Sequence, residues 1–158
     1  MSNHPTNHSE QTQAEVISTG RLLALDLGAK RVGVAISDEL RITVTTLQRL
    51  ERHSWKDLLR QVAALVESYD ARALIIGLPL NMDGTRGEAA EDTLRIAENF
   101  RKSLNVPVLL QDERLTSVAA ESEMKSRGLG TDEVRRRVDS ESAAIILRDF
   151  LTAHVRED

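Results

Sequence analysis

The sequence contains no cysteine and only four aromatic residues. Without cysteine, disulfides, thiolate zinc sites and a cysteine nucleophile are all excluded, and the composition fits a reducing, cytoplasmic location. So few aromatic rings argue against binding of single strands mainly by base stacking. The four histidines lack the spacing of metal ligands, and no G-x-S-x-G motif of a serine hydrolase is present. Any catalytic chemistry is therefore expected to use carboxylates.

Long apolar runs and a basic excess are also absent. No run approaches the roughly 20 residues of a membrane span, so no membrane partner is expected. Residues 1–19 are polar, lack the apolar core of a signal peptide and are predicted to form a disordered tail. The formal net charge is −4, so binding of nucleic acid would depend on local basic clusters. The length of 158 residues, 41% of them hydrophobic, predicts one globular domain over residues 20–155.

Periodicity and turn signals predict an α/β fold with a five-stranded mixed sheet flanked by helices. Strands are expected within 21–37 (two, joined by the turn 28–31), 41–50, 73–77 and 106–110. Helices are expected from Ser54 (with Asp57 as a capping-box partner), over 88–104 and 116–126, and from 132 or 139 to 154. Three antiparallel strands followed by α/β crossovers place helices on both faces. Sites in such sheets form at the carboxyl ends of parallel strands, here after Gly77 and Leu110.

A single carboxylate interrupts the first strand. Asp26 follows four apolar residues and precedes Leu27. Aspartate is depleted in strands and costly to bury unless it is paired or holds a metal ion. Asp26 is therefore the first candidate site residue.

Partners for Asp26 are expected at Asp112 or Glu113 and at Asp139. Strand alternation sends the side chains of Asp112 and Glu113 to opposite faces, so only one of the two should join Asp26, and the sequence leaves open which. Glu141 could substitute for Asp139. Clustered carboxylates are typical ligands of Mg²⁺ or Mn²⁺, which can activate water and stabilise an in-line displacement at phosphorus. Each acidic residue near a helix start could instead only cap that helix.

Basic residues lie beside these acids in the sequence. Lys30 and Arg31 occupy the first turn, Arg86 lies in the loop after the fourth strand, and Arg114 follows Glu113. Residues 81–87 could cradle a phosphate at the following helix, or form an ordinary glycine-containing turn, because the Walker pattern is missing. As single residues, all of these cations could equally be solvated surface charges.

Four ordered motifs resemble the YqgF/RuvX family. They are DLGAKRVGVAISD at 26–38, GLPLNMDGT at 77–85, DERLT at 112–116 and DSESAAIILRDFL at 139–151. The motifs extend over nearly the whole chain apart from the tail. The single departure is Phe150, where tyrosine is common in the family.

The resemblance implies a ribonuclease H-like fold related to the resolvase RuvC. It implies a cytoplasmic nuclease that processes the 5′ end of pre-16S rRNA during ribosome biogenesis, with Mg²⁺ or Mn²⁺ held by Asp26, Glu113 and Asp139. Asp112 shares the third motif and is a second candidate ligand. The implied phosphate contacts are Lys30, Arg31 and Arg114, and Arg86 is added to them from its place in the sequence.

Other functions stay open at the level of sequence. The protein could resolve Holliday junctions in branched DNA, for which a two-fold dimer would be needed, or act as a monomer on single strands. It could bind RNA without catalysis, in ribosome assembly, on ribosomal precursor particles, or in transcription. An actin-like ATPase is disfavoured because such proteins need two lobes and this chain has length for one.

Overall fold

The computed structural model describes residues 19–113 and 131–155, with side chains in the last segment described for residues 140–154. Nearly all of the tail predicted over 1–19, and the helix predicted over 116–126, lie outside this part of the chain. So do Arg114 and the side chain of Asp139.

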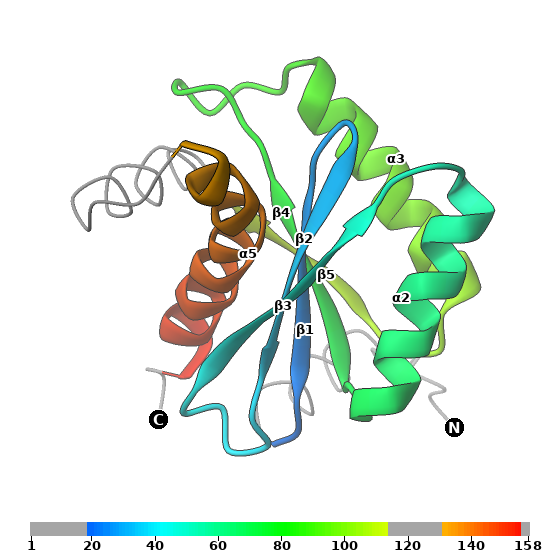
Figure 1. The fold of residues 1–158 in the computed structure, drawn as a ribbon, viewed down its shortest axis with the longest axis vertical. Helices are drawn as coiled ribbons and strands as arrows, with labels where there is room; N and C mark the ends of the chain where they lie inside the picture. The colour runs from blue at the N-terminus through cyan, green and yellow to red at the C-terminus, as the bar shows by residue number, and fades with distance from the viewer. Residues whose placement is uncertain (1–18, 114–130, 156–158) are drawn as a thin grey trace, which may run out of the picture.

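Five strands and three helices make up the described fold (Figure 1). In chain order they are β1 (Leu22–Leu27), β2 (Arg31–Ser37), β3 (Val44–Glu51), α2 (Trp55–Tyr69), β4 (Ala73–Leu78), α3 (Glu88–Ser103), β5 (Val108–Asp112) and α5 (Thr131–Val155). The predicted element order is confirmed over this part of the chain. The described helices include none that is both long and apolar enough to cross a membrane.

The strands form one mixed sheet in the order β3-β2-β1-β4-β5. β2 pairs antiparallel with both β1 and β3, whereas β4 runs parallel to β1 and β5. β4 therefore lies between β1 and β5, which carry the acidic candidates. The last strand begins at Val108, two residues later than predicted, because Pro107 has no N–H for the ladder and its carbonyl accepts from Leu74 N.

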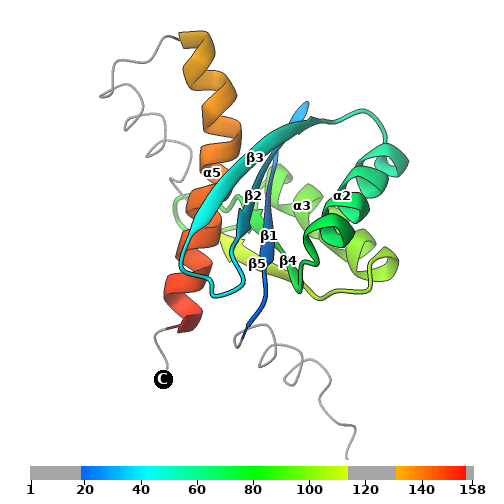
Figure 2. The same cartoon turned by 60° about the horizontal axis from the view of Figure 1, so that its bottom comes forward.

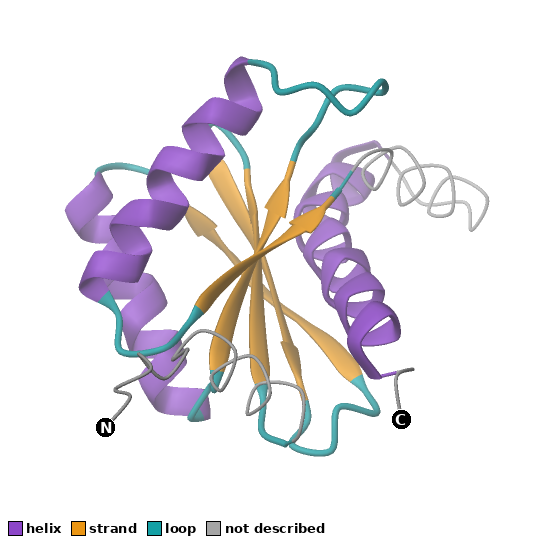
Figure 3. Cartoon of the chain, turned by 180° about the vertical axis from the view of Figure 1, so that it is seen from behind, coloured by secondary structure: helices purple, strands orange, loops and turns teal. Residues whose placement is uncertain are grey.

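Each face of the sheet has its own buried core. Leu23 and Leu25 of β1 point to the face covered by α2 and α3, where Phe100 is fully buried. Leu22 and Ala24 point to the other face, which α5 alone covers among the described helices (Figures 2 and 3). Small residues, Ala143 and Ala144 among them, let α5 lie close to the strands. Alternation therefore assigns Asp26 to the α5 face.

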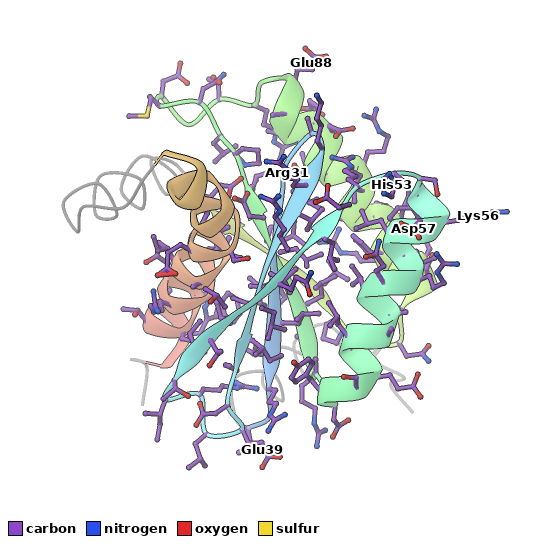
Figure 4. The ribbon with its side chains drawn as sticks, in the orientation of Figure 1. Arg31, Glu39, His53, Lys56, Asp57 and Glu88 are labelled. Atoms are coloured by element: carbon purple, nitrogen blue, oxygen red, sulfur yellow. The ribbon has the colours of Figure 1, made fainter. Side chains whose placement is uncertain are left out.

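Helix α2 begins where the sequence predicts. The Ser54 side chain accepts a hydrogen bond from the Asp57 N–H at 3.1 Å, which is the first half of a capping box. The Asp57 carboxylate instead accepts from Arg60 and Gln61 in the same helix. Asp57 is thus bonded to residues of its own helix, in the first turn of α2 (Figure 4).

One edge of the sheet gathers the loops of interest. β1, β4 and β5 all end at the edge that is uppermost in Figure 1, together with the β1–β2 turn and the loop from β4 to α3. The first turns of α5 lie at the same end. The β2–β3 loop, which contains Glu39, lies at the opposite end (Figure 4).

Candidate active site

Asp26 and Glu113 meet on the α5 face. Asp26 is the fifth residue of β1, and Glu113 follows β5 directly, with its N–H donating to the Leu78 carbonyl at 3.1 Å. Their carboxyl groups are joined by a hydrogen bond. The structure thus brings together two residues that are 87 positions apart in the sequence. Glu113, and not Asp112, is the member of its pair that approaches Asp26.

Glu113 can approach Asp26 because Gly77 has no side chain. β4 separates β1 from β5, so the two acids lie about 10 Å apart at the level of their strands. A Cβ at Gly77 would lie 2.6 Å from Glu113 Oε2 and 2.5 Å from Ile146 Cδ1. Any side chain there would occupy the space through which Glu113 crosses β4.

Burial and charge together change the acidity of Glu113. Burial, the neighbouring charge of Asp26, the hydrogen bond to Asp26 and the charge of Asp112 raise the pKa of Glu113 to about 9. In the metal-free protein Glu113 therefore keeps its proton at neutral pH, and this proton reduces the repulsion between the two carboxyl groups. Among the described residues, Glu113 Oε2 is the buried side-chain oxygen that has no hydrogen-bond partner.

These features fit a hard divalent cation. Carboxylate oxygens are the ligands that Mg²⁺ and similar ions prefer, and a buried oxygen without a partner, on a carboxyl group bonded to a second one, is suited to binding such an ion. The described side chains contain no group of three or more potential metal ligands. A cation held by this pair would therefore need a further donor, such as a side chain from α5 or a water molecule.

Two further acidic candidates have different positions. Asp112 is the last residue of β5, and alternation directs its side chain to the face opposite Glu113, although its charge still raises the pKa of Glu113. Asp139 lies in α5 directly before Ser140, whose Oγ donates to the Leu47 carbonyl of β3 at 2.8 Å.

The basic candidates lie at the same edge of the sheet. Lys30 and Arg31 are exposed at the β1–β2 turn, and Arg86 is exposed in the loop after β4. Figure 4 shows Arg31 close to the end of this turn.

The loop from β4 to α3 is braced by its own side chains. Asp83 accepts from the Thr85 N–H and hydroxyl, and Asn81 donates to the Thr85 hydroxyl at 3.0 Å. Helix α3 begins with Glu88 and Glu91 in its first turn, and Glu88 points to solvent in Figure 4. These negative charges oppose an anion at the helix N-terminus and favour the reading of residues 81–87 as an ordinary turn.

Arg52 is a positioning residue that sequence reasoning missed. Its Nη1 donates to the Gly28 carbonyl at 2.7 Å, its backbone N–H donates to the Lys30 carbonyl at 2.9 Å, and its Nη2 lies 3.5 Å from Asp92 Oδ2 of α3. Arg52 thereby joins the turn after Asp26 to helix α3. No local pattern marks this residue, because its partners come from two distant elements.

Comparison with a solved structure identifies the class of fold. T. thermophilus RuvC in complex with Holliday junction substrate superposes with a TM-score of 0.54, over 86% of this chain and 96% of that chain, at 16% identity. The mixed five-stranded sheet is therefore a ribonuclease H-like fold, as the sequence predicts.

The family is narrower than this class. A family model described as RuvX: Holliday junction resolvase matches residues 20–153. The chain belongs to the RuvX family, which confirms the resemblance of its four motifs.

Curated relatives carry a different name from the family model. A protein of Anaeromyxobacter sp. (strain K) is 40% identical over 131 residues, which are 83% of this chain and 96% of the relative. A protein of Syntrophus aciditrophicus (strain SB) is 39% identical over 137 residues, 87% of this chain and 91% of the relative. Both are named "Putative pre-16S rRNA nuclease".

The contacts of Gly77 predict that Gly77→Ala destabilises the fold by about 1–3 kcal/mol, because the new methyl group overlaps Ile146 and Glu113. Ile146→Val removes the overlapping Cδ1 atom. In urea unfolding, the double variant should therefore lose less stability than the sum of the two single changes. Strict additivity would show that Gly77 is not in contact with Ile146.

The raised pKa of Glu113 predicts a pH-dependent stability. A folded pKa of about 9, above the ordinary 4.5, gives stabilisation that is complete below pH 4.5 and is lost as the pH rises through 9. Measured in EDTA, the thermal midpoint of Glu113→Gln should fall less steeply between about pH 5 and pH 9 than that of the wild type. Identical slopes would contradict a buried, protonated Glu113.

Arg52→Ala should loosen the β1–β2 turn. Loss of the bond to Gly28 is expected to cost about 1 kcal/mol locally, which corresponds to about fivefold faster hydrogen exchange of the Gly28 amide. Arg95→Ala is the matched control, because Arg95 also binds Asp92 but forms no hydrogen bond with the turn among the described residues. Equal exchange rates of the Gly28 amide in the two variants would show that Arg52 does not position the turn.

Proposed function

We propose that this protein is a metal-dependent phosphodiester hydrolase of structured nucleic acid that processes the 5′ end of pre-16S rRNA during ribosome biogenesis. The observation that carries the proposal is the half-buried, hydrogen-bonded Asp26–Glu113 pair at the edge of the sheet where exposed basic residues gather. Family membership and the names of the curated relatives support the nuclease activity and the RNA substrate.

The proposed cation is Mg²⁺ or Mn²⁺, held by Asp26, Glu113 and Asp139, with Asp112 as a second candidate. Such an ion, when bound, supplies Lewis acidity at phosphorus and a more acidic water. Glu113 contributes an oxygen that has no hydrogen-bond partner among the described residues, and the proton of Glu113 must leave before its carboxylate can bind a cation. Asp26 fixes the position of the Glu113 carboxyl group through their hydrogen bond.

The proposed contacts to the substrate backbone are Lys30, Arg31, Arg86 and Arg114. The first three are exposed at the site edge. Cations around a carboxylate site offset the repulsion between acidic protein groups and phosphates. The proposed location is the cytoplasm, where the precursor particles of the ribosome would be the setting of the reaction.

A second candidate function is resolution of Holliday junctions. The description of the matching family model favours it. Symmetric cleavage of a junction would require a two-fold dimer, whereas processing of one RNA end can be done by a monomer. A non-catalytic role in RNA binding is the third candidate, and it would leave the raised pKa of Glu113 without a chemical use.

The test compares wild type, Asp26→Asn and Glu113→Gln on a pre-16S rRNA 5′ fragment, a four-way DNA junction and an unbranched duplex, with Mg²⁺ or Mn²⁺. Both variants should cut at least about 100-fold more slowly, because each removes an acidic group from the proposed ligand set. Asp57→Asn is the control, since Asp57 lies on α2 and binds residues of its own helix. Thermal melting confirms that each variant is folded.

Each result has a distinct meaning. Cleavage of the rRNA fragment that is lost in both variants and kept in Asp57→Asn supports the proposal. Cleavage of the junction alone would favour the resolvase. Cation-independent binding without any cleavage by the wild type would favour the RNA-binding factor.

A further inference from the structure

One large apolar side chain is exposed at the end of the sheet that carries the carboxylate pair. Met82, in the loop from β4 to α3, is 65% exposed. The other exposed large hydrophobic residues of the described chain, Leu40 and Ile42, belong to the β2–β3 loop at the opposite end. A single exposed apolar residue is common on protein surfaces, so the place and the support of Met82 decide what it signifies.

The loop holds Met82 at the tip of a tight turn. The Gly84 N–H donates to the Asn81 carbonyl at 2.8 Å, which makes Met82 and Asp83 the central residues of a β-turn. The Asn81 N–H donates to the Thr85 carbonyl at 2.8 Å and closes the base of this turn. Together with the side-chain bonds to Thr85, these contacts fix the backbone around Met82. A ligand can therefore contact Met82 with little further loss of backbone entropy.

The turn lies on the same side of the sheet as the carboxylate pair. Its loop starts directly after Leu78, whose carbonyl accepts from the Glu113 N–H at 3.1 Å. In Figures 1 and 3 the loop extends from the end of β4 toward the side that α5 covers, which is the side on which Asp26 and Glu113 meet.

The length of the loop limits the distance from Met82 to the pair. Only five residue steps join Met82 to Gly77, beside the Glu113 carboxyl group, so their Cα atoms are at most about 17 Å apart. A helical nucleic-acid strand advances about 3.4 Å per nucleotide. A strand with one phosphate at the carboxylate pair thus has Met82 within about five nucleotides.

The chemistry of Met82 suits the face of a base. A thioether packs favourably on aromatic rings, and apolar side chains such as methionine can insert between the bases of a nucleic acid. The described aromatic rings do not offer such a contact at this end of the sheet. Trp55 packs edge-on against Phe100, Phe150 is buried, and Tyr69 ends α2 at the opposite end.

We propose that Met82 packs against the face of one unstacked base of the substrate strand, within a few nucleotides of the cleaved bond. The proposal rests on the proposed nuclease function and deepens it, because it defines the structural class of substrate. Unstacking costs least where a base is unpaired or mismatched. The favoured substrate is therefore a strand with a loose base beside the cleavage site, and a continuous duplex is disfavoured.

The first experiment removes single bases from the rRNA fragment, one position at a time on either side of the cleavage site. The wild type should cut about two- to tenfold more slowly when one particular base is absent, the range for a thioether on an aromatic ring. Met82→Ala should cut the intact fragment more slowly by the same factor. Loss of that base should then have no further effect in Met82→Ala, because the contact is already absent.

Two further variants separate the size of the side chain from its polarity. Met82→Leu keeps an apolar side chain of similar volume and should respond to the missing base as the wild type does. Met82→Gln has a similar length but a polar end, and should behave as Met82→Ala does. Leu40→Ala and Ile42→Ala are the matched controls, because they shorten exposed apolar side chains at the opposite end of the sheet. Both should cut as the wild type does, and thermal melting checks that each variant is folded.

The second experiment detects the unstacked base without cleavage. A 2-aminopurine at the sensitive position fluoresces more strongly when it leaves its stack, and the Asp26→Asn background keeps the strand intact. Emission at saturating protein should rise in this background and stay low when Met82→Ala is added. Equal emission from the two proteins would contradict the base contact.

The failure of this inference differs from the failure of the proposed function. If the wild type cuts the rRNA fragment but Met82→Ala and Met82→Gln respond to every missing base as the wild type does, the base contact is wrong and the nuclease remains. If Met82→Ala is slow only on precursor particles and not on the protein-free fragment, Met82 contacts a protein and the base contact is also wrong.

The substrate itself is tested separately. If the wild type cuts only the DNA junction, the rRNA function is wrong, and the same removal of bases from the junction strands decides the role of Met82. If the wild type neither binds nor cuts nucleic acid, both proposals are wrong.

Discussion

The hydrogen-bonded contact between Glu113 and Asp26 is the constraint on which the rest of the site depends. Two carboxyl groups held together in a half-buried position repel each other when both are charged. The fold accommodates this arrangement with a raised pKa of Glu113, and it leaves Glu113 Oε2 without a partner among the described residues. The proposed role of the pair rests on these two properties, because a bound cation would take the place of the Glu113 proton.

Gly77 on β4, the strand next to β1, gives the two acids their space. It lets Glu113 cross toward Asp26. Helix α5 covers this face with small residues and packs Ile146 against Gly77. The site is thus surrounded by residues with small side chains or none, at the end of the sheet where the parallel strands finish.

Sequence patterns predicted the sheet and Asp26. They did not predict features that depend on contacts between elements far apart in the sequence. Asp26 was evident because a carboxylate interrupts an apolar strand. The choice of Glu113 over Asp112 was not evident from the patterns. It depends on β5 continuing through Asp112, which sets the face to which each side chain points. The role of Gly77, which leaves room for Glu113 to cross β4, could be recognised only from the strand order. The β-bulge at Gln48 and Arg49 of β3, opposite Gly33, has no residue signature of its own. Arg52 acts through contacts with both the turn and α3, so no local window could reveal it.

The most direct measurement of the central claim is proton release during titration of the metal-free protein with Mn²⁺ at about pH 7.5, by calorimetry in buffers of different ionisation enthalpy. A pKa of about 9 means that Glu113 still carries its proton at this pH. The account predicts release of about one proton per protein molecule at saturation, and none in Glu113→Gln. Binding of Mn²⁺ by the wild type without proton release would contradict it.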